Sequence, residues 1–385
     1  MSGTDETPSN SSNLTTTDEF PSISNASIIA AIDSLTSTGV KWRPVIDANG
    51  VNVHTLADIP HGSDSPQLAL DLYFSDDALK TEAKRPVYIH IHGGGWSRGG
   101  KSSPFYGGPA LCQNAAAAGC VAVAPGYRLG QYPEFVEDAA NAIKWVKDNI
   151  EQFGGDLSNV FLSGHSAGGH IASLLILRHS TFLAPLGIPL DFFRGLVLVS
   201  GVYDLFSPLR SAPLDAKNKF FVFSYVLPAF GSDDKLRREA SPLLLLDPTK
   251  NISVKGSLAQ SITRRLSSSA EIETPKQLDE SVELNTSHIP SVLILNATFD
   301  MGLQENGELL SKALSKYTNV KYALIKGADH ASICWNETSC QEIAEFVKTN
   351  VTNAETASNV IVRRGKRDKM SMCHDETMND EPETK

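Results

Sequence analysis

The sequence is poor in the features that mark secreted, membrane-spanning or metal-binding proteins. It has five cysteines in 385 residues, and none of their spacings is that of a zinc site. The N-terminal residues do not have the pattern of a signal peptide, and no apolar run approaches the roughly 20 residues that are needed to cross a bilayer. An odd number of cysteines without a signal peptide predicts reduced thiols and a cytoplasmic protein. Cys334 and Cys340 are the pair that could form a disulfide if the chain were exported.

Positive charge is also scarce. The chain has 34 lysine and arginine residues against 44 aspartate and glutamate residues, a net charge of −10. Proteins that bind polyanions do so through an excess of basic side chains, so this balance argues against nucleic acid as a partner. We expect a small-molecule substrate instead. Nothing in the sequence bears on the oligomeric state.

Three segments have the composition of loose chain rather than core. Residues 1–24 are rich in polar side chains, residues 353–385 hold a basic cluster followed by an acidic stretch, and residues 250–288 are rich in serine, threonine and charge. We expect disordered ends and a surface insertion at these positions. Residues 25–352 otherwise have enough apolar sequence for one large domain, since 41% of the chain is hydrophobic and only 20% is charged.

Short apolar runs alternate with helix-like stretches through this central region. The expected strands are residues 68–74, 87–91, 120–124, 160–162, 196–200, 292–295 and 321–325, and the expected helices include 135–150 and 169–177. Nearly continuous apolar strands are typical of strands that are buried on both faces. The sequence therefore predicts an α/β fold with a mostly parallel sheet covered by helices on both faces.

The most informative short motif is Gly164-His165-Ser166-Ala167-Gly168. A serine in Gly-x-Ser-x-Gly stands on a sharp turn between a strand and a helix, with its hydroxyl exposed to a pocket. Its neighbours must be small because larger side chains would collide with the adjacent strand or helix. An apolar strand precedes this motif and an apolar helix follows it, as a nucleophilic serine requires. We therefore predict Ser166 as a nucleophile.

A serine hydroxyl is a weak nucleophile, so a histidine must accept its proton and a carboxylate must orient that histidine. In sheets of this type the three groups follow the chain order serine, acid, histidine. Asp300 comes soon after the strand 292–295 and His330 soon after the strand 321–325. Both lie beyond the carboxyl ends of strands, where catalytic groups are expected, so we predict Asp300 as the acid and His330 as the base. Other histidines lie too near the serine in sequence, at a helix end or in the expected insertion: His165, His170, His179 and His288.

A second glycine motif, His92-Gly93-Gly94-Gly95-Trp96, directly follows the strand 87–91. Attack on an acyl carbonyl makes its oxygen negative, and removing one donor that stabilises this oxygen costs about 2.7–4 kcal/mol. The amides of Gly93 and Gly94 can approach such an oxygen because no Cβ stands in the way. The amide of Ala167, at the start of the helix, is a third expected donor. A plain glycine turn is the alternative interpretation.

The residues in and around the glycine motif do not form the pattern of a metal site or of a nucleotide-binding loop. His90 and His92 could form a metal pair, but the sequence supplies no third ligand at a suitable spacing. The string Gly99-Gly100-Lys101-Ser102 does not stand between a strand and a helix start, as a phosphate-binding loop would. We expect His92 to brace the loop by hydrogen bonding, and we expect neither a metal nor an organic cofactor.

Further short motifs accompany these two: Tyr127-Arg128-Leu129, Tyr132-Pro133, Asp138, Phe153-Gly154-Gly155-Asp156, Gly169, and Asp300 with Glu305. From about Leu70 to Lys348, the chain resembles the hormone-sensitive-lipase-type branch of the α/β-hydrolases. The resemblance implies the α/β-hydrolase fold, with a mostly parallel central sheet, helices on both faces and a small lid or cap region. It also implies a Ser166–Asp300–His330 triad and an oxyanion hole formed by Gly93, Gly94 and Ala167.

Within this branch, Asp329-His330 and the short run before the glycine motif are similar to kynurenine formamidases and prenylcysteine methylesterases. The chain departs from both, because Gly95 stands where those enzymes often carry a larger residue and because membrane segments are lacking. It also departs from many members of the branch after Asp300, where Met301-Gly302 replaces a proline-containing turn.

We therefore expect a serine hydrolase that cleaves carboxylic esters of small or moderately apolar substrates through an acyl-enzyme. Trp96, Tyr106 and His165 are predicted to line the substrate pocket, and the apolar segment 220–227 to line it or to form its lid. For the aromatic residues, a place in the core is the alternative. An aryl formamidase of the N-formylkynurenine type and a prenylcysteine methylesterase are the enzymatic alternatives, and a peptidase would share the triad. A hydrolase-fold receptor that only binds its ligand is the non-enzymatic alternative; such proteins typically lose a triad member, and none is missing here.

Overall fold

The computed structural model describes residues 23–35, 39–48, 50–206, 220–246 and 288–351. The expected disordered ends and the expected insertion therefore lie outside the described residues, apart from residues 23, 24 and 288. Disorder at the ends and a surface position for the insertion stay predictions.

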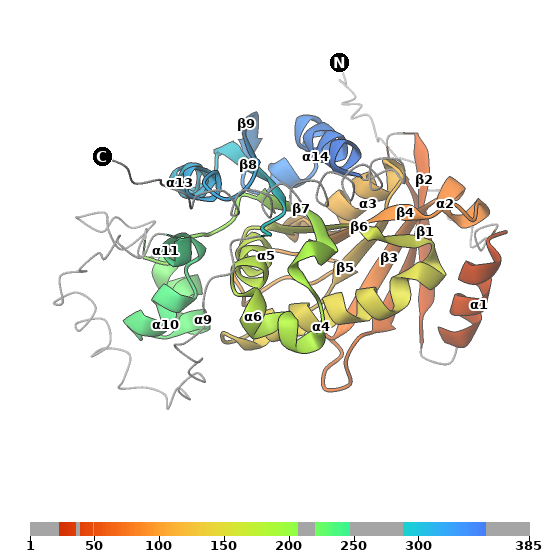
Figure 1. Cartoon of the computed structure of the whole chain (residues 1–385), viewed down its shortest axis with the longest axis horizontal. Coiled ribbons are helices and arrows are strands. Elements are labelled where there is room, and N and C mark those ends of the chain that lie inside the picture. Colours follow the sequence, from red (N-terminus) through yellow and green to blue (C-terminus); the bar gives the residue numbers. More distant parts are fainter. Residues whose placement is uncertain (1–22, 36–38, 49, 207–219, 247–287, 352–385) are drawn as a thin grey trace, which may run out of the picture.

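One nine-stranded sheet runs through the molecule, in the order β1-β2-β3-β5-β4-β6-β7-β8-β9 (Figure 1). The strands are β1 (Lys41–Ala48), β2 (Val51–Pro60), β3 (Ala69–Ser75), β4 (Arg85–Ile91), β5 (Val121–Pro125), β6 (Gly155–His165), β7 (Phe193–Val199), β8 (Ser291–Phe299) and β9 (Val320–Asp329). The pairs from β1 to β5 are antiparallel, and every pair from β5 through β4 to β9 is parallel. The predicted, mostly parallel sheet is confirmed, with β1 and β2 as additions that the sequence pattern did not predict.

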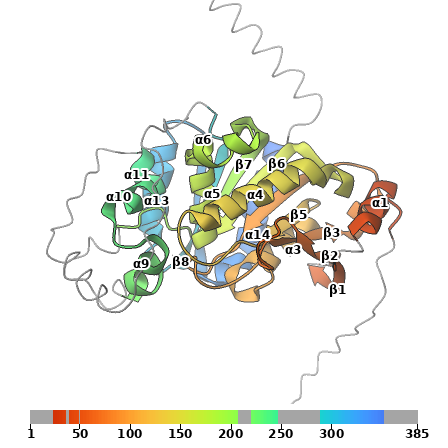
Figure 2. The same ribbon diagram turned by 90° about the horizontal axis from the view of Figure 1, so that it is seen from below.

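Helices cover both faces of this sheet, as expected (Figures 1 and 2). The α-helices are α1 (Ala26–Leu35), α2 (Asp76–Lys80), α3 (Gly108–Ala117), α4 (Glu134–Asn149), α5 (Ala167–Leu177), α6 (His179–Phe182), α9 (Leu227–Phe230), α10 (Asp234–Glu239), α11 (Pro242–Leu246), α13 (Gln304–Leu314) and α14 (Glu337–Asn350). Short 3₁₀ turns are η2 (Pro104–Tyr106), η3 (Ile150–Phe153), η4 (Ala184–Leu186), η5 (Leu190–Phe192) and η7 (Ser332–Cys334), and η6 (Val222–Val226) is a π turn. No helix of the described residues is both long enough and apolar enough to span a bilayer.

The alternation of side chains along the central strands divides the core into two layers. In β4, Val87, Ile89 and Ile91 belong to the cluster shared with α1, α4, α5 and α13, whereas Tyr88 belongs to the cluster shared with α3 and α14. The strands β6 and β7 alternate in the same way. Because successive side chains of a strand point to opposite faces, a strand that is covered on both sides needs apolar residues almost continuously.

The helices α4 and α5 show two different patterns of burial on the same face. The helix α4 buries a stripe that includes Phe135, Ala139, Ile143 and Val146, with charged residues between them. By contrast, all residues of α5 are buried. A helix that is apolar on every side lies inside a protein. The helix that follows Ser166 is therefore held on all sides, which fixes the position of the serine at its start.

A separate helical segment, residues 220–246, packs beside α5 and α13. It comprises η6, α9, α10 and α11, drawn in green at one end of the molecule (Figure 1), and α11 contacts both α5 and α13. This is the described part of the chain that corresponds to the expected lid or cap. Its covering role stays a prediction.

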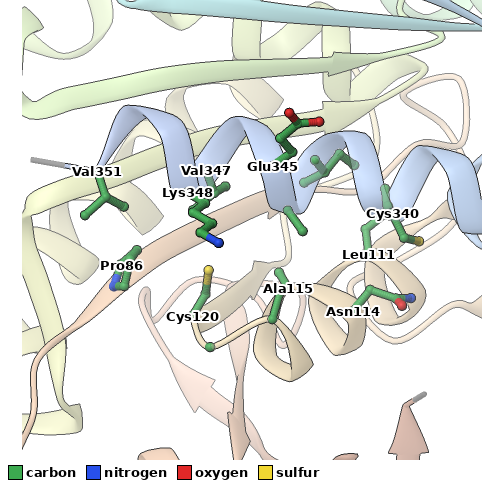
Figure 3. Close-up of a pocket in the computed structure, with 14 residues that line it drawn as sticks. Pro86, Leu111, Asn114, Ala115, Cys120, Cys340, Glu345, Val347, Lys348 and Val351 are labelled. Atoms are coloured by element: carbon green, nitrogen blue, oxygen red, sulfur yellow. The ribbon is translucent and has the colours of Figure 1, made fainter. Parts of the chain in front are cut away.

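A groove of about 650 Å³ lies between α3 and α14 (Figure 3). Pro86, near the start of β4, and Cys120, just before β5, form its floor, and Cys340 and Val347 of α14 line its other side. Because Pro86 is at the amino end of its strand, the groove lies at the opposite edge of the sheet from the loops that follow β4 and β6. It is therefore separate from the two glycine motifs and from Ser166.

Candidate active site

Ser166 occupies a strained turn between β6 and α5. Its backbone has φ 53° and ψ −118°, a left-handed conformation that costs energy for a residue with a side chain. A Cβ at Gly164 would lie 2.2 Å from the Gly168 carbonyl oxygen, and a Cβ at Gly168 would lie 2.0 Å from the Ile91 carbonyl oxygen. Only glycine fits at these two positions. Ser166 as a whole is 9% exposed, so the turn is nearly closed around it.

The structure brings the three residues predicted as a triad into one chain of hydrogen bonds. Asp300 directly follows β8 and His330 directly follows β9. The distance between His330 Nε2 and Ser166 Oγ is 2.9 Å, and the distance between His330 Nδ1 and Asp300 Oδ1 is 2.6 Å. With the Nδ1 proton donated to the carboxylate, Nε2 is free to accept the proton of the serine hydroxyl.

The second oxygen of Asp300 is held by donors that were not predicted from the sequence. Ser200 Oγ and Asn296 Nδ2 each donate to Asp300 Oδ2 at 2.7 Å, and the Ala297 amide donates at 3.2 Å. Ser200 directly follows β7 with φ 47°, and Asn296 lies in β8. Both are polar residues at the ends of apolar runs, which is the one signal in the sequence that could have indicated them.

These contacts set the charge of the buried carboxylate. Burial by itself raises the pKa of Asp300, but the hydrogen bonds and charge of His330 and the hydrogen bonds from Ser200 and Asn296 outweigh it. The pKa of Asp300 is therefore lowered. Asp300 is fully buried and stays ionised at neutral pH, where it can stabilise a protonated His330.

The glycine motif after β4 lies directly beside the serine. A Cβ at Gly93 would lie 3.1 Å from Ser166 Cβ, and one at Gly94, where φ is 118°, would lie 2.0 Å from the Arg98 carbonyl oxygen. The prediction that the Gly93 amide is an oxyanion donor is wrong, because this N–H donates to the Tyr106 carbonyl at 2.9 Å. Among the described residues, no acceptor occupies the N–H groups of Gly94, Gly95 and Ala167. Gly95 is thus an available donor that was not predicted from the sequence.

His92 and Tyr127 brace this motif from below. His92 Nδ1 donates to the Gly93 carbonyl at 2.7 Å, and the Tyr127 hydroxyl donates to the His92 carbonyl at 3.0 Å. The two rings stack with their centroids 4.1 Å apart. Burial lowers the pKa of His92 to about 4, so this ring is neutral at neutral pH. In the part of the chain that is described, no three histidine, cysteine or acidic side chains come together as a metal site.

Two of the three residues predicted to line the pocket are buried instead. Trp96 packs edge-on against Phe230, with the ring centroids 4.9 Å apart, and its Nε1 donates to His170 Nδ1. It belongs to the core and is closed to a substrate in this structure. His165 is also buried, beneath the turn that carries Ser166. Only Tyr106, at the end of η2, is partly exposed.

The described cysteines are all free thiols: Cys112, Cys120, Cys334 and Cys340. Cys334 and Cys340 are thus unpaired here. Burial raises the pKa of Cys340 to about 11 and that of Cys120 to about 12, so neither is a thiolate at neutral pH.

Comparisons with known proteins point to the same fold. A family model described as the α/β hydrolase fold matches residues 88–243. Esterase LipC of Mycobacterium tuberculosis is 28% identical over 221 residues, which cover 54% of this chain and 53% of that protein. The para-nitrobenzyl esterase of Bacillus subtilis is 40% identical over 161 residues, covering 35% of this chain and 32% of that protein. The chain thus spans about half or less of the length of these curated relatives.

The fold itself extends further than these sequence matches. The crystal structure of esterase B from Lactobacillus Rhamnosis aligns with a TM-score of 0.58 and 20% identity, covering 84% of this chain and 90% of that one. At this identity the likeness concerns the fold alone. Together with the sheet order and the turn at Ser166, it shows that the chain has the α/β-hydrolase fold, which is also the fold of the matching family model.

Proposed function

We propose that this protein is a serine hydrolase that cleaves carboxylic esters, with Ser166 as nucleophile, His330 as general base and acid, and Asp300 as the orienting carboxylate. The observation that carries the proposal is the continuous chain of hydrogen bonds from Ser166 through His330 to Asp300. This chain begins at a serine held in the strained turn between β6 and α5, the position expected of a nucleophile. No other arrangement in the described residues combines a nucleophile, a base and an acid in this way.

In the first step, His330 Nε2 removes the proton of Ser166 as Oγ attacks the ester carbonyl. The carbonyl oxygen becomes an oxyanion, and the free amides of Gly94, Gly95 and Ala167 are the donors we propose for it. The protonated His330 then gives its proton to the leaving alcohol. The carbon–oxygen bond to that alcohol breaks, and the acyl group remains on Ser166.

In the second step, water takes the place of the alcohol. His330 removes a proton from the water molecule as it attacks the acyl-enzyme, and the same amides hold the second oxyanion. The bond to Ser166 Oγ then breaks, His330 returns the proton to the serine, and the carboxylic acid leaves. The ionised Asp300 stabilises the imidazolium in both steps.

The substrate class that we propose is an ester of small or moderately apolar parts. LipC, the para-nitrobenzyl esterase and esterase B are all named as esterases, which favours ester hydrolysis over formamidase or prenylcysteine methylesterase activity. The complete set of catalytic groups favours an enzyme over a receptor that only binds. The four free thiols support the further proposal of a cytoplasmic, reducing location.

Hydrolysis of short-chain p-nitrophenyl esters tests this function. We expect turnover by the full-length protein and its loss in Ser166→Ala, by roughly 10⁴-fold or more, because the nucleophile is removed. The two proteins should have the same circular dichroism spectrum and melting temperature. Undiminished turnover by a folded Ser166→Ala would overturn the assignment. A parallel assay with N-formylkynurenine separates ester from formamide preference.

A further inference from the structure

His165, the residue before the nucleophile, has no role in the two chemical steps but lies at the centre of the site. Its side chain is 2% exposed, too little to contact a substrate. The ring points towards the loop that follows β9, where its Nε2 lies 2.8 Å from the carbonyl oxygen of His330. The ring centroids of His165 and His330 are 4.8 Å apart. The residue adjacent to the nucleophile therefore contacts the residue that acts as its base.

The same ring is wedged against the other loops of the site. A Cβ at Gly93 would lie 2.8 Å from His165 Nδ1, so the glycine motif lies directly against the ring. A Cβ at Gly107 would lie 3.2 Å from His165 Cβ and 2.9 Å from Cys334 Sγ. The loops after β4, β6 and β9 thus meet at one side chain. A flat ring with one N–H group fills a space that these glycines leave open.

The carbonyl of His330 fixes the direction of this bond, and the bond in turn fixes which ring nitrogen of His165 carries the proton. Burial, together with the nearby His330, lowers the pKa of His165 to about 3. At neutral pH the ring is neutral and carries one proton. The Tyr106 carbonyl also faces the ring, but the bond to the His330 carbonyl is the stronger of the two. Because a carbonyl oxygen can only accept, this bond places the proton on Nε2 and runs from His165 to His330. A neutral ring also adds no positive charge beside His330 at the moment when His330 itself becomes an imidazolium.

We propose that His165 is a positioning residue that fixes the loop of His330 relative to Ser166 through its Nε2–H donation to the His330 carbonyl. The bond acts on the backbone of the base, whereas Asp300 acts on its ring. Together they define where Nε2 of His330 stands with respect to Ser166 Oγ. Displacements of about 1 Å in such a geometry can reduce rates by about 100-fold. This role rests on the proposed function, since it concerns the same triad.

Three variants separate the hydrogen bond from the volume of the ring. His165→Gln carries an amide N–H at about the distance of Nε2, His165→Asn carries the same group one methylene shorter, and His165→Leu has no donor. We expect kcat for a p-nitrophenyl ester to fall roughly 10- to 100-fold in the Asn and Leu variants and to stay within about fivefold of wild type in the Gln variant. KM should be unchanged in all three, because the side chain does not reach the substrate.

His179→Leu is the matched control. His179 Nε2 donates to the Ile188 carbonyl at 2.7 Å, the same kind of bond in a part of the fold away from the triad. Its loss should leave kcat unchanged. Melting temperatures of all variants show which of them are folded. If His165→Leu does not fold, the comparison of His165→Gln with His165→Asn still shows whether the hydrogen bond to the His330 carbonyl matters.

The outcomes distinguish this role from the proposed function. Equal decreases of kcat in the Gln and Asn variants, or an increase of KM with kcat unchanged, would overturn the positioning role. An active wild-type protein would still support the proposed ester hydrolase in that case. A wild-type protein that neither hydrolyses esters nor reacts with a fluorophosphonate would overturn the proposed function and, with it, the role of His165.

Discussion

At the scale of single residues, the charge of Asp300 depends on groups that take no part in the chemistry. A fully buried carboxylate is costly unless its oxygens accept hydrogen bonds. Here one oxygen binds the ring of His330, and Ser200, Asn296 and the Ala297 amide occupy the other. The carboxylate therefore has one orientation, and it presents the same oxygen to His330 in every step.

Removing one of these donors should impair catalysis without abolishing it. We expect Ser200→Ala to lower kcat about 10-fold, since a hydrogen bond to a charged group contributes about 1.5–3 kcal/mol and two other donors remain. KM should not change. Steady-state kinetics with a p-nitrophenyl ester measures both. Ser315→Ala, which removes an exposed hydroxyl bonded to the Ser311 carbonyl, should have no effect. An unchanged kcat in Ser200→Ala would show that Asp300 needs no such support.

The sequence predicted the residues of the site whose side chains carry out the chemistry. It did not predict which backbone N–H groups are free, because that depends on the conformation of the loops. Ser166, Asp300 and His330 could be chosen because a nucleophile, an acid and a base must follow strands in a set order. The engagement of the Gly93 amide could not be foreseen, because its partner is the backbone carbonyl of Tyr106. Carbonyl groups are the same in every residue, so sequence gives no sign of which one accepts.

At the scale of elements, the site consists of loops at one edge of the parallel strands. The motif after β4, the turn after β6 and the loops after β8 and β9 meet there because the carboxyl ends of parallel strands share an edge. Glycine is required in the motif after β4 for two reasons: its backbone adopts conformations that other residues rarely adopt, and it has no side chain. At Gly94, φ is 118°, a value that L-residues rarely adopt.

Two glycine-to-alanine changes in this segment should therefore differ sharply. In Gly94→Ala the new Cβ would lie 2.0 Å from the Arg98 carbonyl oxygen, so the loop must move and the amides beside Ser166 move with it. We expect kcat to fall about 100-fold or more, the loss caused by one oxyanion donor. Gly100 has open space at its Cβ position, so Gly100→Ala should keep wild-type activity. Equal activities in the two variants would contradict the role of the glycine loop.

The central strands could be predicted from the sequence and the first two could not. Strands such as β4 and β7 are buried on both faces, which produces the apolar runs that were recognised. The strand β1 is exposed along most of its length and contains Pro44, so it lacks both an apolar run and a clear alternation. The pairing of β1 and β2 with the rest of the sheet therefore depends on tertiary contacts rather than on local pattern.

At the scale of the whole molecule, several histidines are kept neutral inside the fold. Burial lowers the pKa of His92 and His170 to about 4, that of His165 to about 3, and that of His90 well below its ordinary value of 6.5. In the unfolded chain the same residues take up protons below pH 6.5. The unfolded state therefore binds more protons than the folded state in mildly acidic solution.

The free energy of unfolding should accordingly be highest above pH 6.5 and fall as the pH drops from about 6.5 towards about 4. Each such histidine contributes a slope of up to about 1.4 kcal/mol per pH unit within this window. Urea denaturation at a series of pH values from 7.5 to 4.5 measures the slope. A free energy of unfolding that stays constant from pH 7 to pH 5 would show that these histidines are not buried as neutral groups.

The central claim is that Ser166 is an activated nucleophile, and covalent labelling with a fluorophosphonate tests it most directly. The intact mass of the treated protein should rise by one phosphonyl group, and peptide mapping should locate this group on Ser166 among all the serines of the chain. Labelling should disappear in Ser166→Ala and slow markedly in His330→Ala, because the hydroxyl then lacks its base. A folded wild-type protein that takes up no label, or that is labelled equally after Ser166→Ala, would contradict the account.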